Sequence, residues 1–388
     1  MMRRLVPAGR ASPRLRPLAL AVCAALVLAS AAASALQCPR GSRPRRVRDG
    51  RQSMRACVRR KGGQRHGPFV RFHRGGRKQE AGEYRDGRRH GPYRSWHRRG
   101  ALIETGSYLA GKRNGEVKRW YRSGKPRSIE QWRNGERDGA FQAWFRNSSD
   151  RGDYALGKKH GRWVTDVYTG ERKHTTWHDG HKQGLYEAFG RNGQRLEQGR
   201  FEGNERVGVW QGWWADASQR HRSTYVDGKR HGVSQRWHPS GALAEKLSWS
   251  QGLREGRGQR WSPKGTLLLD GTWHLGRRHG AFRTFYLDGS PESVSRWVDD
   301  KLTGRQDRYW PGKAALMLTA HWRTGQLDGP WARYRKDGTL EIRGTFRNGE
   351  RVGPWRTIDA KDAKDAASKP TNGAASVPDA VDRIGAKK

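Results

Sequence analysis

Eleven lysine and arginine residues recur along the chain, each two positions before a glycine that returns about every 24 residues. These basic residues are Arg65, Arg89, Arg113, Arg137, Lys159, Lys182, Arg206, Arg230, Arg254, Arg278 and Arg351. Positive charges at a fixed interval suit a repeating anion, such as anionic lipid head groups, an acidic envelope glycan or nucleic acid. The alternative is that they are solvated turn residues that prevent edge-to-edge aggregation of strands.

Histidine is the other residue type that recurs at a fixed place, directly before the same glycine. It stands there at His66, His90, His160, His231 and His279. A ladder of histidines could bind metal ions, but other repeats carry Asn, Asp, Gln or Val at this position, so we interpret these histidines as turn residues. No Ser-His-Asp set, phosphate-binding loop or metal-ligand spacing stands out. We therefore expect no enzymatic activity, no metal and no cofactor.

The three cysteines are Cys23, Cys38 and Cys57. Residues 1–35 have the pattern of a secretory signal peptide: arginines, then an apolar run, then an Ala-Ser-Ala cleavage site. Cleavage would remove Cys23 and leave two cysteines in an exported chain, which indicates one structural disulfide. Lipid attachment at Cys38 is the open alternative.

Composition limits the fold. The chain has 388 residues and a formal net charge of +42, with 51 Gly and 18 Trp, 11 Tyr and 9 Phe. The charge and the scarcity of aliphatic residues would suggest disorder, but the many aromatics argue against it. One apolar run excludes a multi-pass membrane protein. Residues 359–388 lack aromatics and apolar periodicity, and we expect a disordered tail there.

The recurring glycine, here called the anchor glycine, defines about 13 repeats between residues 63 and 358. The anchors are Gly67, Gly91, Gly115, Gly139, Gly161, Gly184, Gly208, Gly232, Gly256, Gly280, Gly304, Gly329 and Gly353. Aromatic residues recur seven positions before the anchor and two and five positions after it, as in Tyr84, Tyr93 and Trp96 around Gly91. A second glycine usually lies four positions before the anchor. Such regular self-similarity is typical of repeat architectures.

Short aromatic segments between glycine-containing turns predict an all-β fold, an elongated solenoid-like meander of about 13 β-hairpins of 24 residues each. Asp86-Gly87 and Asn134-Gly135 are dipeptides typical of two-residue hairpin turns. In this meander the basic residues would lie in turns along one edge, roughly 10 Å apart. The aromatics two and five positions after the anchor have opposite parity, so either both faces carry aromatics or a bulge changes the parity. We expect one row to form the core and the other to be partly exposed.

The repeats resemble the MORN repeat (membrane occupation and recognition nexus), and most closely its bacterial variant, the YwqK-type antitoxin family. The stretches that carry the resemblance are Gly82–Gly91 (GEYRDGRRHG) and Gly271–Gly280 (GTWHLGRRHG). The resemblance implies a β-hairpin scaffold, a dimerisation surface or a phospholipid-binding module. Some repeats depart from the pattern, with Asn204 and Asp300 in place of the second glycine and Ser234, Gly258 and Gln306 in place of an aromatic. Such repeats would bend the ribbon or form binding gaps.

These observations predict four segments: a signal peptide at 1–35, a cysteine-containing cap at 36–62, the repeat array at 63–358 and the tail at 359–388. The cap and the tail are too short for a catalytic domain. We expect an exported protein, periplasmic, cell-surface or secreted, that binds or scaffolds at the bacterial envelope. Its partner would be a protein or an anionic lipid or glycan surface, whereas nucleic acid is disfavoured for an exported chain. The alternative is an antitoxin or immunity protein that binds a toxin directly. The sequence leaves the oligomeric state open.

Overall fold

The computed structural model describes residues 36–49 and 52–358. The segments expected to be a signal peptide and a tail lie outside the described residues. The described chain consists of strands, turns and short connections, which confirms the all-β prediction. Among the described residues, no helix is long and apolar enough to cross a membrane.

The strands share a length of seven to ten residues, except for β7 and β8, which are two parts of one interrupted strand. They are β1 (Ser42–Asp49), β2 (Gln52–Arg59), β3 (Arg65–Phe72), β4 (Lys78–Arg85), β5 (Arg88–Trp96), β6 (Leu102–Leu109), β7 (Lys112–Arg113), β8 (Gly115–Trp120), β9 (Pro126–Arg133), β10 (Glu136–Trp144), β11 (Ser148–Ala155), β12 (Lys158–Val167), β13 (Arg172–His178), β14 (His181–Phe189), β15 (Arg195–Glu202), β16 (Glu205–Trp213), β17 (Gln219–Val226), β18 (Lys229–Trp237), β19 (Leu243–Ser250), β20 (Leu253–Trp261), β21 (Leu267–His274), β22 (Arg277–Phe285), β23 (Pro291–Val298), β24 (Lys301–Tyr309), β25 (Leu316–Arg323), β26 (Gln326–Tyr334), β27 (Leu340–Arg347) and β28 (Glu350–Thr357).

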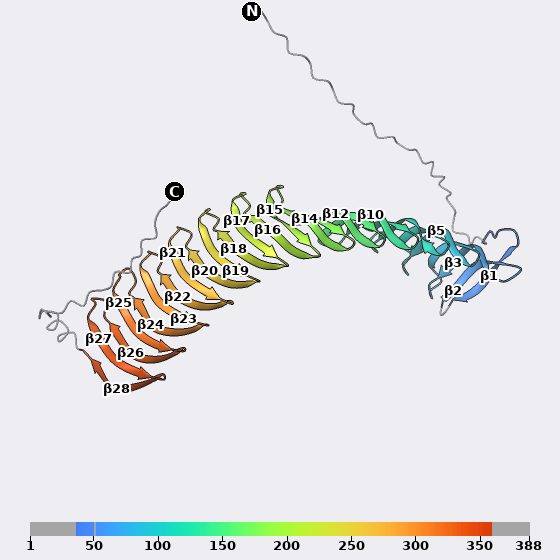
Figure 1. Cartoon of the computed structure of the whole chain (residues 1–388). Coiled ribbons are helices and arrows are strands. Elements are labelled where there is room, and N and C mark those ends of the chain that lie inside the picture. The colour runs from blue at the N-terminus through green and yellow to red at the C-terminus, as the bar shows by residue number, and fades with distance from the viewer. Residues whose placement is uncertain (1–35, 50–51, 359–388) are drawn as a thin grey trace, which may run out of the picture.

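All strands belong to one antiparallel sheet in which strands that follow one another in the sequence pair side by side. The exception is the interrupted strand, since β7 and β8 both pair with β6. The sheet is a long, twisted ribbon that starts at β1 and ends at β28 (Figure 1). At ~4.8 Å per strand its length is roughly 120 Å.

The hairpin turns have the conformation that their dipeptides predict. Asp86 and Gly87 both adopt a positive φ, 50° and 76°, which is the signature of a two-residue type I′ turn. The two departures from glycine keep this conformation, since φ is 77° at Asn204 and 66° at Asp300. Consecutive turns are also bonded to one another: the Gly87 amide donates to the Arg65 carbonyl oxygen at 2.9 Å, and the Gly111 amide to that of Arg89 at 2.7 Å. This contact recurs along the array and explains why the repeat length is nearly constant.

The anchor glycine lies inside a strand, not in a turn as the simple alternation of segments and turns suggests. Gly91 has a φ of 72° and lies in β5, where the pairing with β4 jumps from Glu83↔His90 to Ala81↔Arg94. A β-bulge in the left-handed region favours glycine because a Cβ would be strained there. The pairing of β5 with β6 shifts as well, from Ser95↔Glu104 to Trp96↔Leu102. This second bulge falls between the aromatic positions two and five residues after the anchor, where their opposite parity called for one.

One aromatic row forms the core, as expected. It combines the aromatics two positions after each anchor with those seven positions before the next, and neighbouring rings such as Tyr93 and Tyr108 lie 4.7 Å apart. Its buried members are Phe69, Tyr84, Tyr93, Trp163, Phe201, Trp210, Trp273 and Phe282. The aromatics five positions after the anchor, such as Trp96, are partly exposed.

The core row has little depth, so its rings lie directly on small residues of the preceding strand. A Cβ added to Gly199 would lie 2.2 Å from the ring of Trp210, and one added to Gly152 would lie 2.5 Å from the ring of Trp163. This small residue, nine positions before the anchor, is therefore part of the repeat pattern.

In the repeats that lack an aromatic, other side chains occupy its place in the core row. At Gly258 the space is taken by Leu247, whose Cδ2 would lie 2.6 Å from an added Cβ. Ser234 is buried and accepts a hydrogen bond from Trp249 Nε1 at 2.7 Å. Gln306 accepts one from Trp322 Nε1 at 3.1 Å.

The cysteine-containing segment continues the sheet, which the sequence analysis did not foresee. Strands β1 and β2 form a hairpin that pairs with β3, and Met54 and Ala56 are fully buried against Phe69. A disulfide joins Cys38 to Cys57, with the Cα atoms 5.5 Å apart. It ties the residues before β1 to β2 at the end of the ribbon, where strands otherwise fray.

Candidate binding surface along the aromatic row

The eleven basic residues lie over the aromatic row, not in turns at the edge as we expected. The reason is the hairpin register: a two-residue turn places the aromatic seven positions before the anchor directly opposite the basic residue two positions before it. Trp132 thus pairs with Arg137, and Trp249 with Arg254. Residues directly opposite in an antiparallel pair project from the same face.

Every one of the eleven has its charged group over an aromatic ring, at 3.5 to 5.6 Å from the nearest ring centroid. Rings and cations alternate, because a ring contacts the basic residues of two successive repeats. Trp132 lies between Arg113 at 5.2 Å and Arg137 at 5.4 Å. Each such contact is worth about 0.5–2 kcal/mol, depending on burial. The basic row therefore helps to hold the sheet together.

Carboxylates neutralise part of this row. Arg89 pairs with Glu80 at 2.6 Å, Arg113 with Glu104 at 2.7 Å and Arg137 with Glu130 at 2.9 Å. Further along the ribbon, Arg206 lies 3.7 Å from Glu197 and Arg278 lies 2.8 Å from Asp300. These arginines are already committed to a protein carboxylate and offer little to an external anion.

Three members of the row are exposed and, within the described residues, have no carboxylate partner: Arg230, Arg254 and Arg351. Arg230 and Arg254 both contact the ring of Trp249, at 5.0 and 5.9 Å. Their repeats carry Ser234 and Gly258 in place of an aromatic. Here two free guanidinium groups and an indole ring lie together in solvent reach, which suits an anionic group with an apolar or sugar body.

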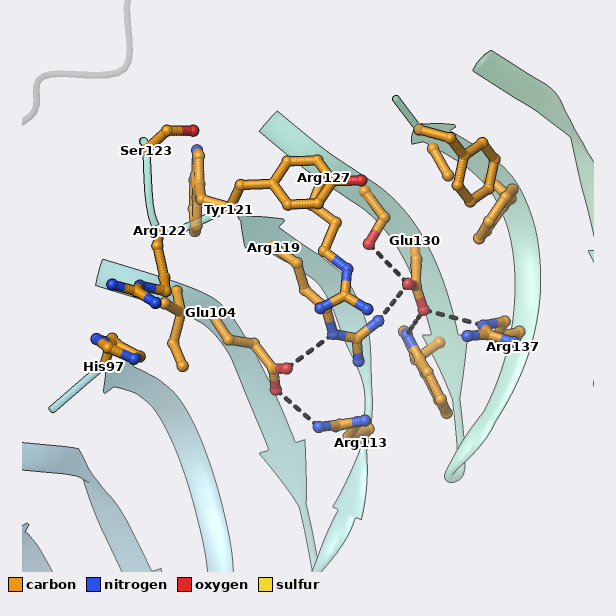
Figure 2. Close-up of a pocket in the computed structure, with 17 residues that line it drawn as sticks. His97, Glu104, Arg113, Arg119, Tyr121, Arg122, Ser123, Arg127, Glu130 and Arg137 are labelled. Carbon is orange, nitrogen blue, oxygen red and sulfur yellow. Dashed lines mark hydrogen bonds and ion pairs between the residues drawn. The ribbon is translucent and has the colours of Figure 1, made fainter. Parts of the chain in front are cut away.

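A hollow with a volume of about 920 Å³ lies near the N-terminal end of the ribbon, over β6 to β10. Figure 2 shows two acidic side chains at its floor, Glu104 and Glu130, bridged by Arg119. Glu130 is 2% exposed; it binds Arg119 and Arg137 and also accepts hydrogen bonds from Ser128 and Trp132. The Tyr93 hydroxyl donates to Glu104.

Burial alone would raise the pKa of these two carboxyls, but their hydrogen bonds and ion pairs outweigh it. The donors are Tyr93 and Arg119 for Glu104, and Arg137, Ser128 and Arg119 for Glu130, and the pKa of both groups falls below the ordinary value. The carboxylates therefore remain ionised and fully occupied. The site is a structural ion network open to solvent at its rim, where Arg122 and Arg127 are exposed.

The acidic side chains of the network were missed in the sequence analysis. A signal was present, since Glu80, Glu104 and Glu197 all stand eleven positions before their anchors. In the hairpin register this position shares the core face with the aromatic row, which places each glutamate beside the basic residue of its own repeat.

A half-buried histidine, His221, lies close to the basic row and makes stability depend on pH. His221 lies opposite Gly212, where an added Cβ would come within 2.2 Å of its ring. Burial, reinforced by Arg220 and Arg206, lowers its pKa to about 4. An unfolded histidine titrates near 6.5. The fold therefore favours the neutral ring, and that stabilisation is present above about pH 6.5 and is lost as the pH falls toward 4.

We expect acidification from pH 7.5 to 5 to cost about 2 kcal/mol of unfolding free energy around His221, because the unfolded state takes up the proton first. Hydrogen exchange of the segment 205–226 at the two pH values, corrected for intrinsic rates, measures this loss. The variant His221→Gln should abolish most of the difference. Equal pH dependence in the variant would show that other groups cause it.

Comparisons with known proteins agree with the repeat architecture. Residues 113–134 match the family described as the MORN repeat variant. No curated protein sequence matches the chain. Among solved structures, a mutant form of the Photorhabdus luminescens Tc holotoxin pore aligns with 77% of this chain and 23% of that chain, at 9% identity and a TM-score of 0.13. An overlap this slight carries no argument. The chain thus contains a MORN-type repeat, and MORN repeats suggest a scaffold or a binding protein.

Proposed function

We propose that the protein is a non-enzymatic, exported binding or scaffold protein of the bacterial envelope, which contacts an anionic lipid or glycan surface through the free part of its basic row. The observation that supports this proposal most is the cluster of Arg230, Arg254 and Trp249, where both guanidinium groups are exposed and have no carboxylate partner in the part of the chain that the structure describes. The high net charge of +42 would attract the chain to such a surface from a distance.

The test is co-sedimentation of the protein with anionic and neutral vesicles at low and high salt. We expect salt-sensitive binding to anionic vesicles only, weakened at least about tenfold by Arg230→Glu with Arg254→Glu, since each reversal replaces an attraction by a repulsion. The matched control is Arg74→Glu with Arg146→Glu, two exposed arginines at equivalent positions of other turns. It changes the net charge equally, so equal loss in both variants would reduce the effect to bulk charge and contradict a site.

The antitoxin or immunity role is the alternative within this proposal. The MORN-type repeat allows it, because a ribbon with free cations and rings also suits an acidic protein partner. Absence of vesicle binding, together with capture of one defined protein that the Arg230 and Arg254 variant fails to capture, would favour this role over the envelope surface.

A further inference from the structure

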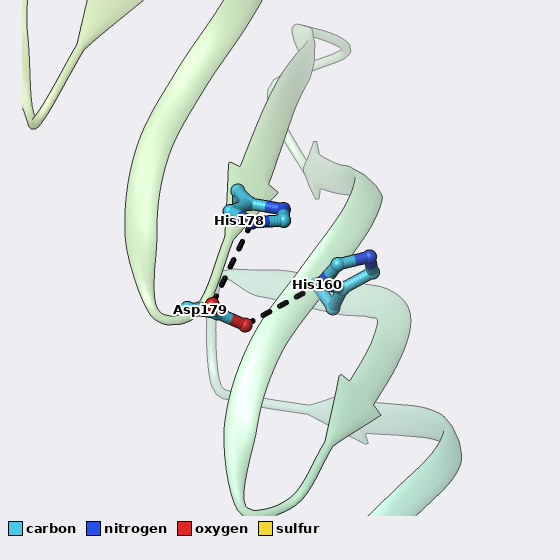
Figure 3. A group of neighbouring side chains, drawn as sticks. All are labelled: His160, His178 and Asp179. Carbon is cyan, nitrogen blue, oxygen red and sulfur yellow. Dashed lines mark ion pairs between the residues drawn. The ribbon is translucent and has the colours of Figure 1, made fainter.

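Three potential metal ligands meet between two successive hairpin turns in the middle of the ribbon. His160 lies in β12, and His178 and Asp179 lie at the end of β13 and in the turn that follows (Figure 3). One ligand atom from each of the three lies within 4.8 Å of the others. Asp179 Oδ1 is 3.9 Å from His160 Nδ1, and Asp179 Oδ2 is 3.5 Å from His178 Nε2.

One atom of this group has no hydrogen-bond partner among the described residues. His160 Nδ1 is shielded from solvent by its surroundings and makes no hydrogen bond, although its ring is otherwise partly exposed. An unpaired nitrogen of this kind costs free energy, which a ligand to that nitrogen would recover.

The repeats themselves show which part of the group is ordinary. Two other repeats also have a histidine before the anchor glycine and an aspartate as the first residue of the next hairpin turn. The distance from Nδ1 to Oδ1 is 3.3 Å for His66 and Asp86, and 3.6 Å for His279 and Asp299. A histidine–aspartate pair is therefore a recurring contact between turns. The residue before the aspartate differs: it is Arg85 or Val298 in those two repeats and His178 in this one.

We propose that His160, His178 and Asp179 bind one divalent transition-metal ion, with Zn²⁺ as the representative. Two imidazoles and one carboxylate are a donor set for Zn²⁺ or Cu²⁺ and a poor one for Mg²⁺ or Ca²⁺, which require more oxygen ligands. The three side chains are 43%, 66% and 61% exposed, so an ion has direct access and water can fill the fourth position. The opposite strand residue, His181, is already bonded to Asn204 at 2.8 Å.

The ion would join two repeats at the turn edge of the ribbon. Such a link needs only small movements, because the three ligand atoms already lie within 4.8 Å of one another. It would restrict opening of the hairpin turn at Asp179 and Gly180. Of the five histidines of the ladder considered from the sequence, only His160 belongs to this site.

The experiment is calorimetric titration of the untagged full chain with Zn²⁺, followed by hydrogen exchange with and without the ion. We expect one principal site, at least about tenfold weaker in His178→Ser and in Asp179→Asn, with no comparable binding of Mg²⁺. Both variants keep the turn, since the chain itself carries Ser250 before an equivalent turn and Asn134 within one. Protection on Zn²⁺ addition should be confined to residues near 158–182.

Two further variants make the result decisive. Asp299→Asn should leave Zn²⁺ binding unchanged, because the pair of His279 and Asp299 has Val298 where the proposed site has His178. Val298→His should add a second site, because it completes the same three ligands at His279 and Asp299, on an exposed position. Binding by the original chain that persists in His178→Ser, or no binding at all, would overturn the proposal.

Discussion

Glu130→Gln is expected to lower the free energy of unfolding of the N-terminal part of the ribbon by about 3 kcal/mol, because it removes the carboxylate that binds Arg137 and one of the two that bind Arg119. Glu130 has a side chain that is 3% exposed and binds both Arg119 and Arg137. The substitution preserves the size and shape of the side chain, so the loss reports the charge and not a cavity. Urea unfolding and hydrogen exchange of residues 113–154 measure it.

The control for this prediction is Glu116→Gln, on an exposed glutamate paired with Lys118 at 2.8 Å. An ion pair in solvent contributes little, so we expect a change within about 0.5 kcal/mol. The effect at Glu130 should also depend on pH. Its pKa is held below that of an unfolded glutamate, so its contribution is complete above the unfolded value and disappears as the pH falls through the folded one. Equal losses at Glu130 and Glu116 would contradict a buried network.

The sequence predicted the hairpin array because its information is local. The turn dipeptides specify positive φ over two residues, as at Asp86 and Gly87, and aromatic spacing specifies which residues face the core. Each hairpin contacts only its neighbours, so correct local rules propagate along the chain without any long-range prediction. The strand pairing of β1 and β2 escaped notice because those residues lack the repeat's glycine and aromatic spacing.

The candidate surface was predicted less well, because it depends on register and not on spacing alone. We identified the basic residues but placed them in edge turns, whereas the hairpin register lays Arg137 over Trp132. The division into neutralised and free cations could not be read from periodicity, since Arg113 and Arg230 occupy the same repeat position. What separates them is a carboxylate on a neighbouring strand, Glu104, which the repeat anchored at Gly232 does not supply.

The tight contact between the strand glycine and the core ring gives the last prediction. Gly199→Ala places a methyl group where Trp210 now lies, 2.2 Å from the ring, and φ at Gly199 is one that alanine adopts freely. Trp210 is 0% exposed and contacts Tyr186 and Phe201, so it has no space to move. We expect a loss of about 3 kcal/mol from overpacking, and about 3–5 kcal/mol for Trp210→Ala, which removes the ring.

The two changes should be strongly coupled. Once the ring is gone, the added methyl group meets no clash, so Gly199→Ala in the Trp210→Ala background should cost less than about 1 kcal/mol, a coupling of about 2 kcal/mol. The chain contains a natural version of this exchange, with Leu247 at the small position and Gly258 at the aromatic one. Gly75→Ala is the matched control, because Gly75 has open space around it and no positive φ. Hydrogen exchange of residues 186–226 measures the losses. Additive losses in the double variant would show that the ring and the glycine act independently, and would contradict the requirement for a small residue beneath the core ring.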